Sequence, residues 1–182
     1  MCLSRADHLG KDLASIMARA GCRRVFFGIE SGNAGMLNII GKRIVLSDAR
    51  RAVTAAKAAG METGAFFILG YPGETSESLL ETLHFSSSLP LDYLSYSFPY
   101  PIPGTGLHER VKTRITMPEW RKQRGKAGRH DLVFKGDFSA RKLRFAQYKG
   151  TTQHWLRTHG RITGKTADIF ELVTDKILKR IT

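Results

Sequence analysis

Residues 25–31 read Val-Phe-Phe-Gly-Ile-Glu-Ser, a short apolar run that ends in a carboxylate and a hydroxyl. A run of this length, rich in β-branched and aromatic residues and followed by a turn signal, is typical of a buried strand in a parallel sheet. Parallel sheets carry their chemistry at the carboxyl ends of their strands. Glu30 and Ser31 are therefore predicted to lie at the edge where a binding site would form.

A second stretch, Ala-Phe-Phe-Ile-Leu-Gly-Tyr-Pro-Gly-Glu at residues 65–74, repeats this pattern. Between the two runs we predict a helix that Ser47 caps and Gly60 ends, with an alanine-rich face suited to packing on a sheet. Two buried strands joined by such a helix form a βαβ unit. Their two glycine-plus-carboxylate ends are expected to share one rim.

The same alternation extends to both sides of this unit. The pattern predicts a strand that ends at residue 4, helices over residues 7–20 and 36–40, a helix opened by Thr75 and Ser78, and a strand over residues 92–98. The apolar face of the first helix is assigned to Leu9, Leu13, Ile16 and Met17. The predicted fold class is α/β, with parallel βα repeats and too few strands to close an eight-stranded barrel.

The character of the chain changes after residue 116. We predict a βα domain over residues 1–116 and a basic helical extension over residues 117–182. Residues 111–182 hold 18 Lys and Arg against 6 Asp and Glu, whereas residues 1–110 are almost neutral. The extension is predicted to hold a mobile linker over residues 121–130, a helix over 138–157, and a helix over 167–181 with an apolar face of Ile169, Phe170, Val173, Ile177 and Leu178.

A basic extension of this kind suggests an anionic partner, such as nucleic acid, a membrane surface or an acidic protein. The alternative is a solvated helical surface whose charge recognises nothing. We favour the alternative, because the extension carries no recognisable nucleic-acid motif. Nucleic acid is therefore not expected as a partner, although the charge leaves it open.

Cys2 and Cys22 are the only cysteines. This usage does not suggest a disulfide framework and favours a reducing, cytoplasmic location, and Cys22 is interpreted as a small core residue. Two cysteines cannot supply the four ligands of a cluster or a structural zinc, and the six histidines lack metal-ligand spacing, so no metal ligand is predicted. The longest apolar stretch, around residues 65–69, is too short to span a bilayer.

Several motifs, in order and spacing, make residues 1–110 similar to radical S-adenosylmethionine (SAM) enzymes. They are Gly21-Cys22, Phe-Gly-Ile-Glu-Ser-Gly-Asn at residues 27–33, Lys42, Ala59-Gly60, and Gly-Ala-Phe-Phe-Ile-Leu-Gly-Tyr-Pro-Gly-Glu-Thr at residues 64–75. The sequence most resembles the cobalamin-associated branch that includes the anaerobic magnesium-protoporphyrin monomethyl ester cyclase. Pro-Ile-Pro-Gly-Thr at residues 101–105 matches that branch's loop after the last barrel strand.

The resemblance implies a partial TIM-type barrel, SAM as cofactor, a small-molecule substrate, and cobalamin supplied by an upstream domain. The family binds a [4Fe–4S] cluster through Cys-x-x-x-Cys-x-x-Cys, a motif that this chain lacks. If the resemblance holds, residue 1 lies at about the third of six barrel strands, and the cluster-binding half would lie upstream. The expectation is the C-terminal half of a radical SAM enzyme, inactive alone. The alternative is a non-catalytic half-barrel whose basic tail binds nucleic acid or an acidic partner.

The resemblance also points to cofactor-binding residues at the ends of the strands. Glu30 is expected to accept hydrogen bonds from the two ribose hydroxyls of SAM; otherwise it caps the helix that follows it. Ser31 is a weaker candidate that fits a turn hydroxyl equally well. Gly28 lets the ligand approach the backbone or only makes the turn. Lys42 meets an acid of SAM or of the substrate, or is an exposed loop lysine.

The remaining candidates lie on the second and third predicted strands. Ile68 and Gly70 match the family segment whose isoleucine flanks adenine. Phe98 lines the adenine or the substrate, although buried aromatic packing is the commoner role. Glu74 is predicted to be structural, because a carboxylate at a helix N-terminus stabilises free N–H groups. No catalytic residue is identified.

Overall fold

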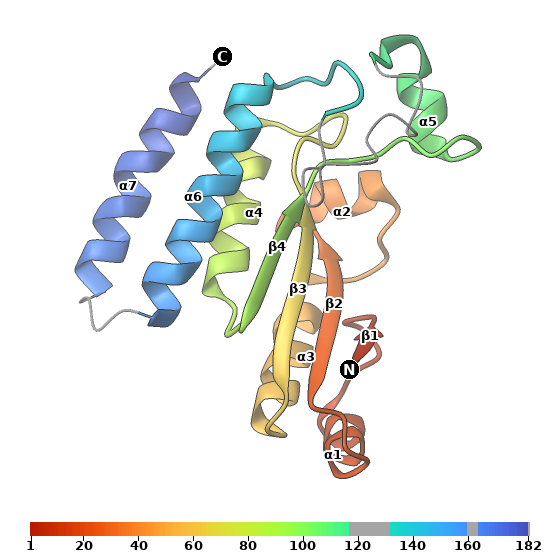
Figure 1. The fold of residues 1–182 in the computed structure, drawn as a ribbon, viewed down its shortest axis with the longest axis vertical. Helices are drawn as coiled ribbons and strands as arrows, with labels where there is room; N and C mark the ends of the chain where they lie inside the picture. Colours follow the sequence, from red (N-terminus) through yellow and green to blue (C-terminus); the bar gives the residue numbers. More distant parts are fainter. Residues whose placement is uncertain (117–131, 160–163, 182) are drawn as a thin grey trace, which may run out of the picture.

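The computed structural model describes residues 1–116, 132–159 and 164–181. Its centre is a parallel sheet with the strand order β1-β2-β3-β4 (Figure 1). The strands are β1 (Cys2–Ser4), β2 (Arg24–Glu30), β3 (Glu62–Ile68) and β4 (Tyr93–Ser97). Every pair of neighbours is parallel, so the predicted α/β fold of βα repeats is confirmed.

The helices connect the strands and then continue beyond them. They are α1 (Lys11–Arg19), α2 (Ala34–Ile40), α3 (Leu46–Ala58), α4 (Ser76–Ser88), α5 (Gly106–Val111), the short 3₁₀ helix η1 (Lys112–Arg114), α6 (Ala140–His159) and α7 (Gly164–Arg180). Helix α3 contacts β3 and α1, while α6 contacts β4, α4 and α7. Figure 1 shows α6 and α7 standing beside α4 on the β4 side of the sheet. None of the helices in the described residues is long and apolar enough to cross a membrane.

The core lies between the sheet and its helices, and the strands alternate accordingly. Val25, Phe27 and Ile29 of β2 are fully buried, and they join the same core as the apolar residues of α3 and α4. The other face of β2 is half-buried, and there the Phe26 ring stacks on Phe66 at a centroid distance of 5.4 Å. Burying a large apolar side chain is worth about 1.5–3 kcal/mol, so the alternation of β2 fixes which face meets the helices.

Most helix ends follow the predicted signals. Gly41 ends α2 in the left-handed conformation, with φ of +80°. Thr75 and Ser78 form a reciprocal capping box at the start of α4. The prediction for Ser47 was wrong, because α3 begins at Leu46 with Val45 as an N-cap that makes no side-chain hydrogen bond. The short helix α5, whose N-cap is Thr105, was not predicted.

The first helix differs from its prediction in both start and face. Helix α1 begins at Lys11, after the extended residue Gly10, so the buried residue Leu9 precedes the helix. Leu13 and Ile16 are 44% and 53% exposed, whereas Ala14 is fully buried. The contact with the alanine-rich helix α3 explains the difference, since small residues allow two helices to approach closely.

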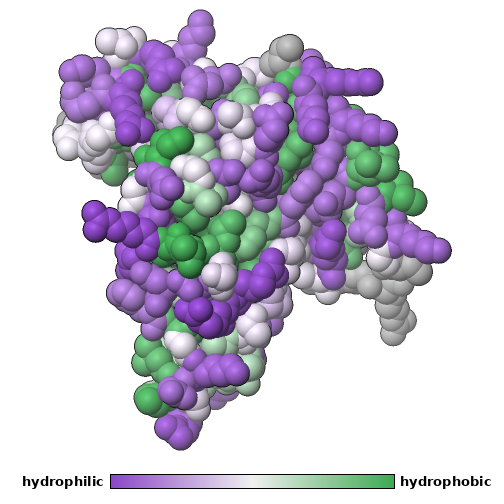
Figure 2. Space-filling view, turned by 180° about the vertical axis from the view of Figure 1, so that it is seen from behind, coloured by the Kyte–Doolittle hydropathy of each residue, from purple (hydrophilic) through white to green (hydrophobic). Residues whose placement is uncertain are grey.

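Helix α7 turns a different face inward from the one predicted. Ile169, Val173 and Ile177 are exposed, and only Leu178 of the predicted face is fully buried. Hydrophobic surface is visible over α7 at the right-hand side of Figure 2. The inward face instead carries Glu171 and Asp175, because these carboxylates pair with cations on α6. A carboxylate facing a neighbouring cation loses less by burial than one without a partner.

The C-terminal helices belong to the same core as the sheet. Leu143 and Leu178 are members of the main buried cluster, and Gln147 Nε2 donates a hydrogen bond to the backbone oxygen of Tyr96 at 3.0 Å. An antiparallel bridge also pairs Ile115 with Phe134. The division of the chain at residue 116 stays a prediction, and the linker predicted over residues 121–130 lies outside the described residues.

Candidate functional site

Glu30 has an unusual backbone conformation at the carboxyl end of β2. Its φ is +76°, and among the described residues it is the only non-glycine residue with a positive φ. The register between β2 and β3 shifts between Gly28 and Glu30, as at a β-bulge. Bulges re-aim a side chain beside a site, and left-handed backbone in a non-glycine residue costs about 1–3 kcal/mol. The fold therefore places this carboxylate at an energetic cost.

Lys42 holds the Glu30 carboxylate above the backbone of Gly28. Its Nζ lies 3.1 Å from Oε1 of Glu30, and the two side chains are 20% and 21% exposed. A Cβ at Gly28 would lie 2.7 Å from that same oxygen and 3.2 Å from the ammonium nitrogen. Gly28 thus makes room for the ion pair. The interpretation of Lys42 as an exposed loop lysine is wrong, because its side chain is only 20% exposed and pairs with Glu30.

Ser31 and Asn33 shape the turn that follows. The Ser31 side chain is buried; its Oγ lies 2.9 Å from Oγ1 of Thr82 on α4 and accepts a hydrogen bond from the backbone N–H of Asn33 at 3.1 Å. These contacts favour the turn-hydroxyl interpretation of Ser31. Asn33 is the N-cap of α2, because its Oδ1 accepts from the N–H of Met36 at 2.8 Å. The alternative in which Glu30 caps this helix is therefore wrong.

Gly70 and Glu74 form a compact turn after β3. Gly70 has φ of +83°, and its N–H donates to Oε2 of Glu74 at 2.6 Å. A Cβ at Gly70 would lie 2.5 Å from Cδ1 of Leu143 on α6, so this glycine also allows close packing. Burial raises the pKa of Glu74 to about 7, and the Gly70 N–H opposes that rise. These contacts agree with a structural role for Glu74.

The sheet brings the other candidates to the rim that Glu30 occupies. Ile68 ends β3 on its half-buried side, and Phe98 follows the last residue of β4. Phe98 also packs against the main core, as expected of a buried aromatic residue. Glu30 pairs with Phe67 across β2 and β3, so the ends of these strands are level. The rim therefore combines one carboxylate, held by a lysine, with apolar side chains that suit a flat ring and its sugar.

A separate polar cluster joins α4, α6 and α7. His84 Nε2 lies 2.9 Å from Oδ2 of Asp175 and 3.3 Å from Oε1 of Glu171. These three side chains carry the kinds of atoms that bind metals, and the atoms all lie within 4.8 Å of one another. The sequence analysis did not predict this cluster. However, Lys149 pairs with Asp175 at 2.8 Å, and Arg157 pairs with Glu171 at 2.8 Å. Because the protein compensates both carboxylates itself, we assign the cluster a structural role.

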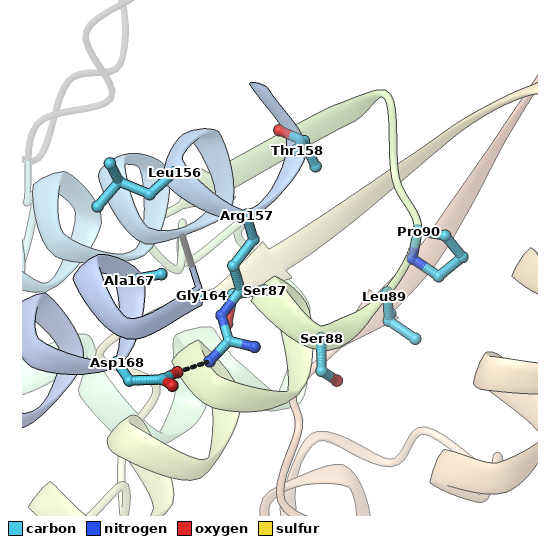
Figure 3. Close-up of a pocket in the computed structure, with 10 residues that line it drawn as sticks. All are labelled: Ser87, Ser88, Leu89, Pro90, Leu156, Arg157, Thr158, Gly164, Ala167 and Asp168. Carbon is cyan, nitrogen blue, oxygen red and sulfur yellow. Dashed lines mark ion pairs between the residues drawn. The ribbon is translucent and has the colours of Figure 1, made fainter. Parts of the chain in front are cut away.

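A cavity of about 590 Å³ lies between the end of α4 and the helices α6 and α7 (Figure 3). Arg157 and Asp168 face each other across it at 3.6 Å. Leu89 and Pro90, which also line it, come just before β4, so the cavity lies at the amino ends of the strands. It is therefore separate from the rim that carries Glu30.

Comparison with known proteins shows what the sheet-forming part of the chain resembles. The family model described as the radical SAM superfamily matches residues 1–86, a range that contains Gly28, Glu30 and Glu74. These residues are similar to the radical SAM superfamily. The match covers the sheet up to β3 and most of α4, and this confirms the resemblance that the strand-end motifs indicated.

Two curated relatives extend this radical SAM assignment. An uncharacterized methyltransferase of Pyrococcus horikoshii is 37% identical over 122 residues, which cover 65% of this chain and 26% of the relative. The anaerobic magnesium-protoporphyrin IX monomethyl ester cyclase of Cereibacter sphaeroides is 25% identical over 112 residues, which cover 62% of this chain and 18% of the relative. The chain thus spans about a quarter, or less, of the curated relatives that it matches. The predicted similarity to the cyclase branch is confirmed.

The fold of the chain also has a counterpart among solved structures. The cobalamin-dependent S-adenosylmethionine radical enzyme OxsB aligns with a TM-score of 0.57 and 15% identity, over 98% of this chain and 34% of that chain. At this identity the likeness concerns the fold alone. Because it covers nearly all of the chain, it includes the helical C-terminal region as well as the sheet.

Proposed function

We propose that this chain supplies part of the SAM-binding wall of a cobalamin-associated radical SAM enzyme. The observation that carries the proposal is the Glu30 carboxylate, which a bulge and Lys42 hold at the carboxyl end of β2. A carboxylate in this position has the chemistry needed to accept hydrogen bonds from the vicinal hydroxyls of a ribose. The relatives support a methyltransferase or cyclase type of reaction, and the substrate is a small molecule.

The described residues fit the nucleoside part of SAM. Lys42 contacts Oε1 of Glu30, and within the described residues no hydrogen bond or ion pair engages Oε2, so this oxygen remains available to a hydroxyl donor. Ile68 at the end of β3 and Phe98 just after β4 offer apolar surface at the same rim for an adenine ring. Ser31 and Gly70 contribute indirectly, because their hydrogen bonds fix the turns that carry the rim.

The residues of this chain do not fit a [4Fe–4S] cluster. Cys2 and Cys22 are hydrogen-bonded to each other, and such a cluster takes four cysteine ligands or close substitutes. We therefore derive no reaction step through the cluster. In this proposal the cluster and cobalamin come from outside these 182 residues, and the chain is inactive alone. Bound SAM would supply the group that is transferred or the radical that starts the reaction.

The proposal is tested by calorimetric titration of SAM into the 182-residue chain and its variants. A charge-assisted hydrogen bond contributes about 1.5–3 kcal/mol, so Glu30→Gln should weaken SAM binding at least about tenfold. Glu62→Gln is the matched control, because Glu62 is also paired with a cation, Arg24, but begins β3 at the opposite end of the sheet. The control should bind SAM as the wild type does. Wild-type affinity in Glu30→Gln, or no binding by the wild type, would contradict the site.

A second candidate function rests on the outer face of α6. Tyr148 and Trp155 are 63% and 52% exposed there, within the basic half of the chain. Exposed aromatic rings among cations are the usual surface for single-stranded nucleic acid. Titration with a single-stranded oligonucleotide at several salt concentrations separates the two functions, because phosphate contacts give an affinity that falls steeply with salt.

We also keep the cytoplasmic location as a prediction from the cysteine usage.

A further inference from the structure

The two cysteines of the chain meet at the amino-terminal end of the sheet. Cys2 is the first residue of β1, and Cys22 lies just before β2. Their Sγ atoms are 3.7 Å apart and share a hydrogen bond, although the residues are 20 positions apart in the sequence. Both side chains are partly exposed and both pack against the edge of the main core. A reagent as small as a peroxide therefore has access to the pair.

Only a small movement is needed to bring the two sulfur atoms to bonding distance. A disulfide has an S–S distance of about 2.05 Å, so the sulfurs must approach by less than the width of one atom. Strand β1 has three residues, and among the described strands it pairs only with β2, with Cys2 opposite Val25. A short edge strand of this kind can shift slightly without disturbing the buried strands. The carboxylate at Glu30 lies at the other end of β2.

We propose that Cys2 and Cys22 form a reversible intramolecular disulfide, which makes this end of the sheet a thiol-based redox switch. The inference does not depend on the proposed SAM site, because no residue of that site takes part. With a peroxide as oxidant, one of the two thiols is first oxidised to a sulfenic acid, and hydrogen peroxide is reduced to water. The other thiol then attacks that sulfur, the S–S bond forms, and the sulfenic oxygen leaves as a second molecule of water.

The surroundings of Cys2 affect its reactivity. Burial, and then the hydrogen bond with Cys22, raise the pKa of the Cys2 thiol. Because the thiolate is the form that attacks a peroxide, this favours the unreactive thiol form of Cys2 until the oxidant arrives, and either sulfur of the pair can then be oxidised first. A dithiol reductant reverses the reaction by exchange. The disulfide would close a loop around α1 and fasten β1 to the start of β2.

The experiment treats the full chain with hydrogen peroxide and compares it with untreated protein. The expected product is a monomer that has lost two hydrogen atoms in mass, with a non-reduced tryptic peptide pair joining residues 1–5 to residues 20–23. Its Tm should rise by about 5–10 °C, because a cross-link over a loop of this size restricts the unfolded chain. Dithiothreitol should return both the mass and the Tm to their starting values.

Two single variants test the internal link. Cys2→Ser and Cys22→Ser each leave one thiol without its partner, so peroxide should produce neither the linked peptide pair nor the rise in Tm. The remaining cysteine should instead accumulate a sulfenic acid, which dimedone labels. Disulfide-linked dimers of the wild type, or sulfinic acids without the internal link, would overturn the proposal.

Discussion

Lys42 Nζ lies 3.1 Å from Oε1 of Glu30, directly above a glycine that has no side chain to obstruct the pair. Lys42 comes from the loop after α2, and Glu30 ends β2 in a left-handed backbone conformation. One carboxylate is thus positioned by three unusual features: a strained backbone, a neighbouring glycine and an ion pair with a lysine 12 residues away. Strain that the rest of the fold maintains in this way is characteristic of functional sites.

Gly28→Ala should destabilise the protein by displacing this ion pair. The added methyl group would lie 2.7 Å from Oε1 of Glu30, so the carboxylate or the strand must move. Because that oxygen is the end of a flexible side chain that can move aside, we expect a loss of about 1 kcal/mol in the free energy of unfolding, measured by urea denaturation. Gly106→Ala is the control: a Cβ there meets nothing within 4 Å at the first residue of α5, so we expect no loss of stability. An unchanged stability for Gly28→Ala would show that the pair is not held where described.

Glu74 should make the stability of the protein depend on pH in a definite direction. Its pKa is about 7 in the folded protein and 4.5 in the unfolded chain. Between these values the unfolded chain releases a proton that the folded protein keeps, so the free energy of unfolding falls as pH rises from about 4.5 to 7. The total loss is on the order of 3–4 kcal/mol, at about 1.4 kcal/mol per unit of pKa difference.

Glu74→Gln keeps an acceptor for the Gly70 N–H but cannot ionise, so this loss should disappear. Urea denaturation at several pH values compares the two proteins. Glu81→Gln, which changes an exposed glutamate on the same helix α4, should keep the wild-type profile. Parallel profiles for wild type and Glu74→Gln would show that the buried carboxyl does not titrate in this range.

Gly150→Ala should test whether α6 is seated on β4 as described. A Cβ at Gly150 would lie 2.5 Å from the hydroxyl oxygen of Tyr96, whose ring is buried and whose hydroxyl is 2.5 Å from Oγ of Ser86. Alanine favours an isolated helix by about 1 kcal/mol over glycine, and overpacking costs about 1–3 kcal/mol, so we expect a net loss of stability of about 1–2 kcal/mol. Thermal and urea unfolding measure it, with the exposed Thr151→Ala as control. A stabilised Gly150→Ala protein would mean that α6 lies elsewhere.

The sequence alone determined the alternation of strands and helices and the edge at which the polar groups gather. The apolar run at residues 25–31 and its repeat at residues 65–74 predicted two neighbouring parallel strands, because a local pattern reflects burial on one or both faces of a strand. Glycines such as Gly41 predicted helix ends for an equally local reason, since few other residues adopt a positive φ.

The tertiary structure alone decided which partners the side chains meet. Lys42 reaches Glu30 across 12 positions, and Cys2 reaches Cys22 across 20 positions, only because the fold brings these segments together at the sheet. Helix α7 has apolar residues on one side, yet it turns its acidic side inward because Lys149 and Arg157 of α6 lie there. A periodic pattern shows that a helix has two different faces, but the charges and shapes of the neighbouring elements decide which face is buried.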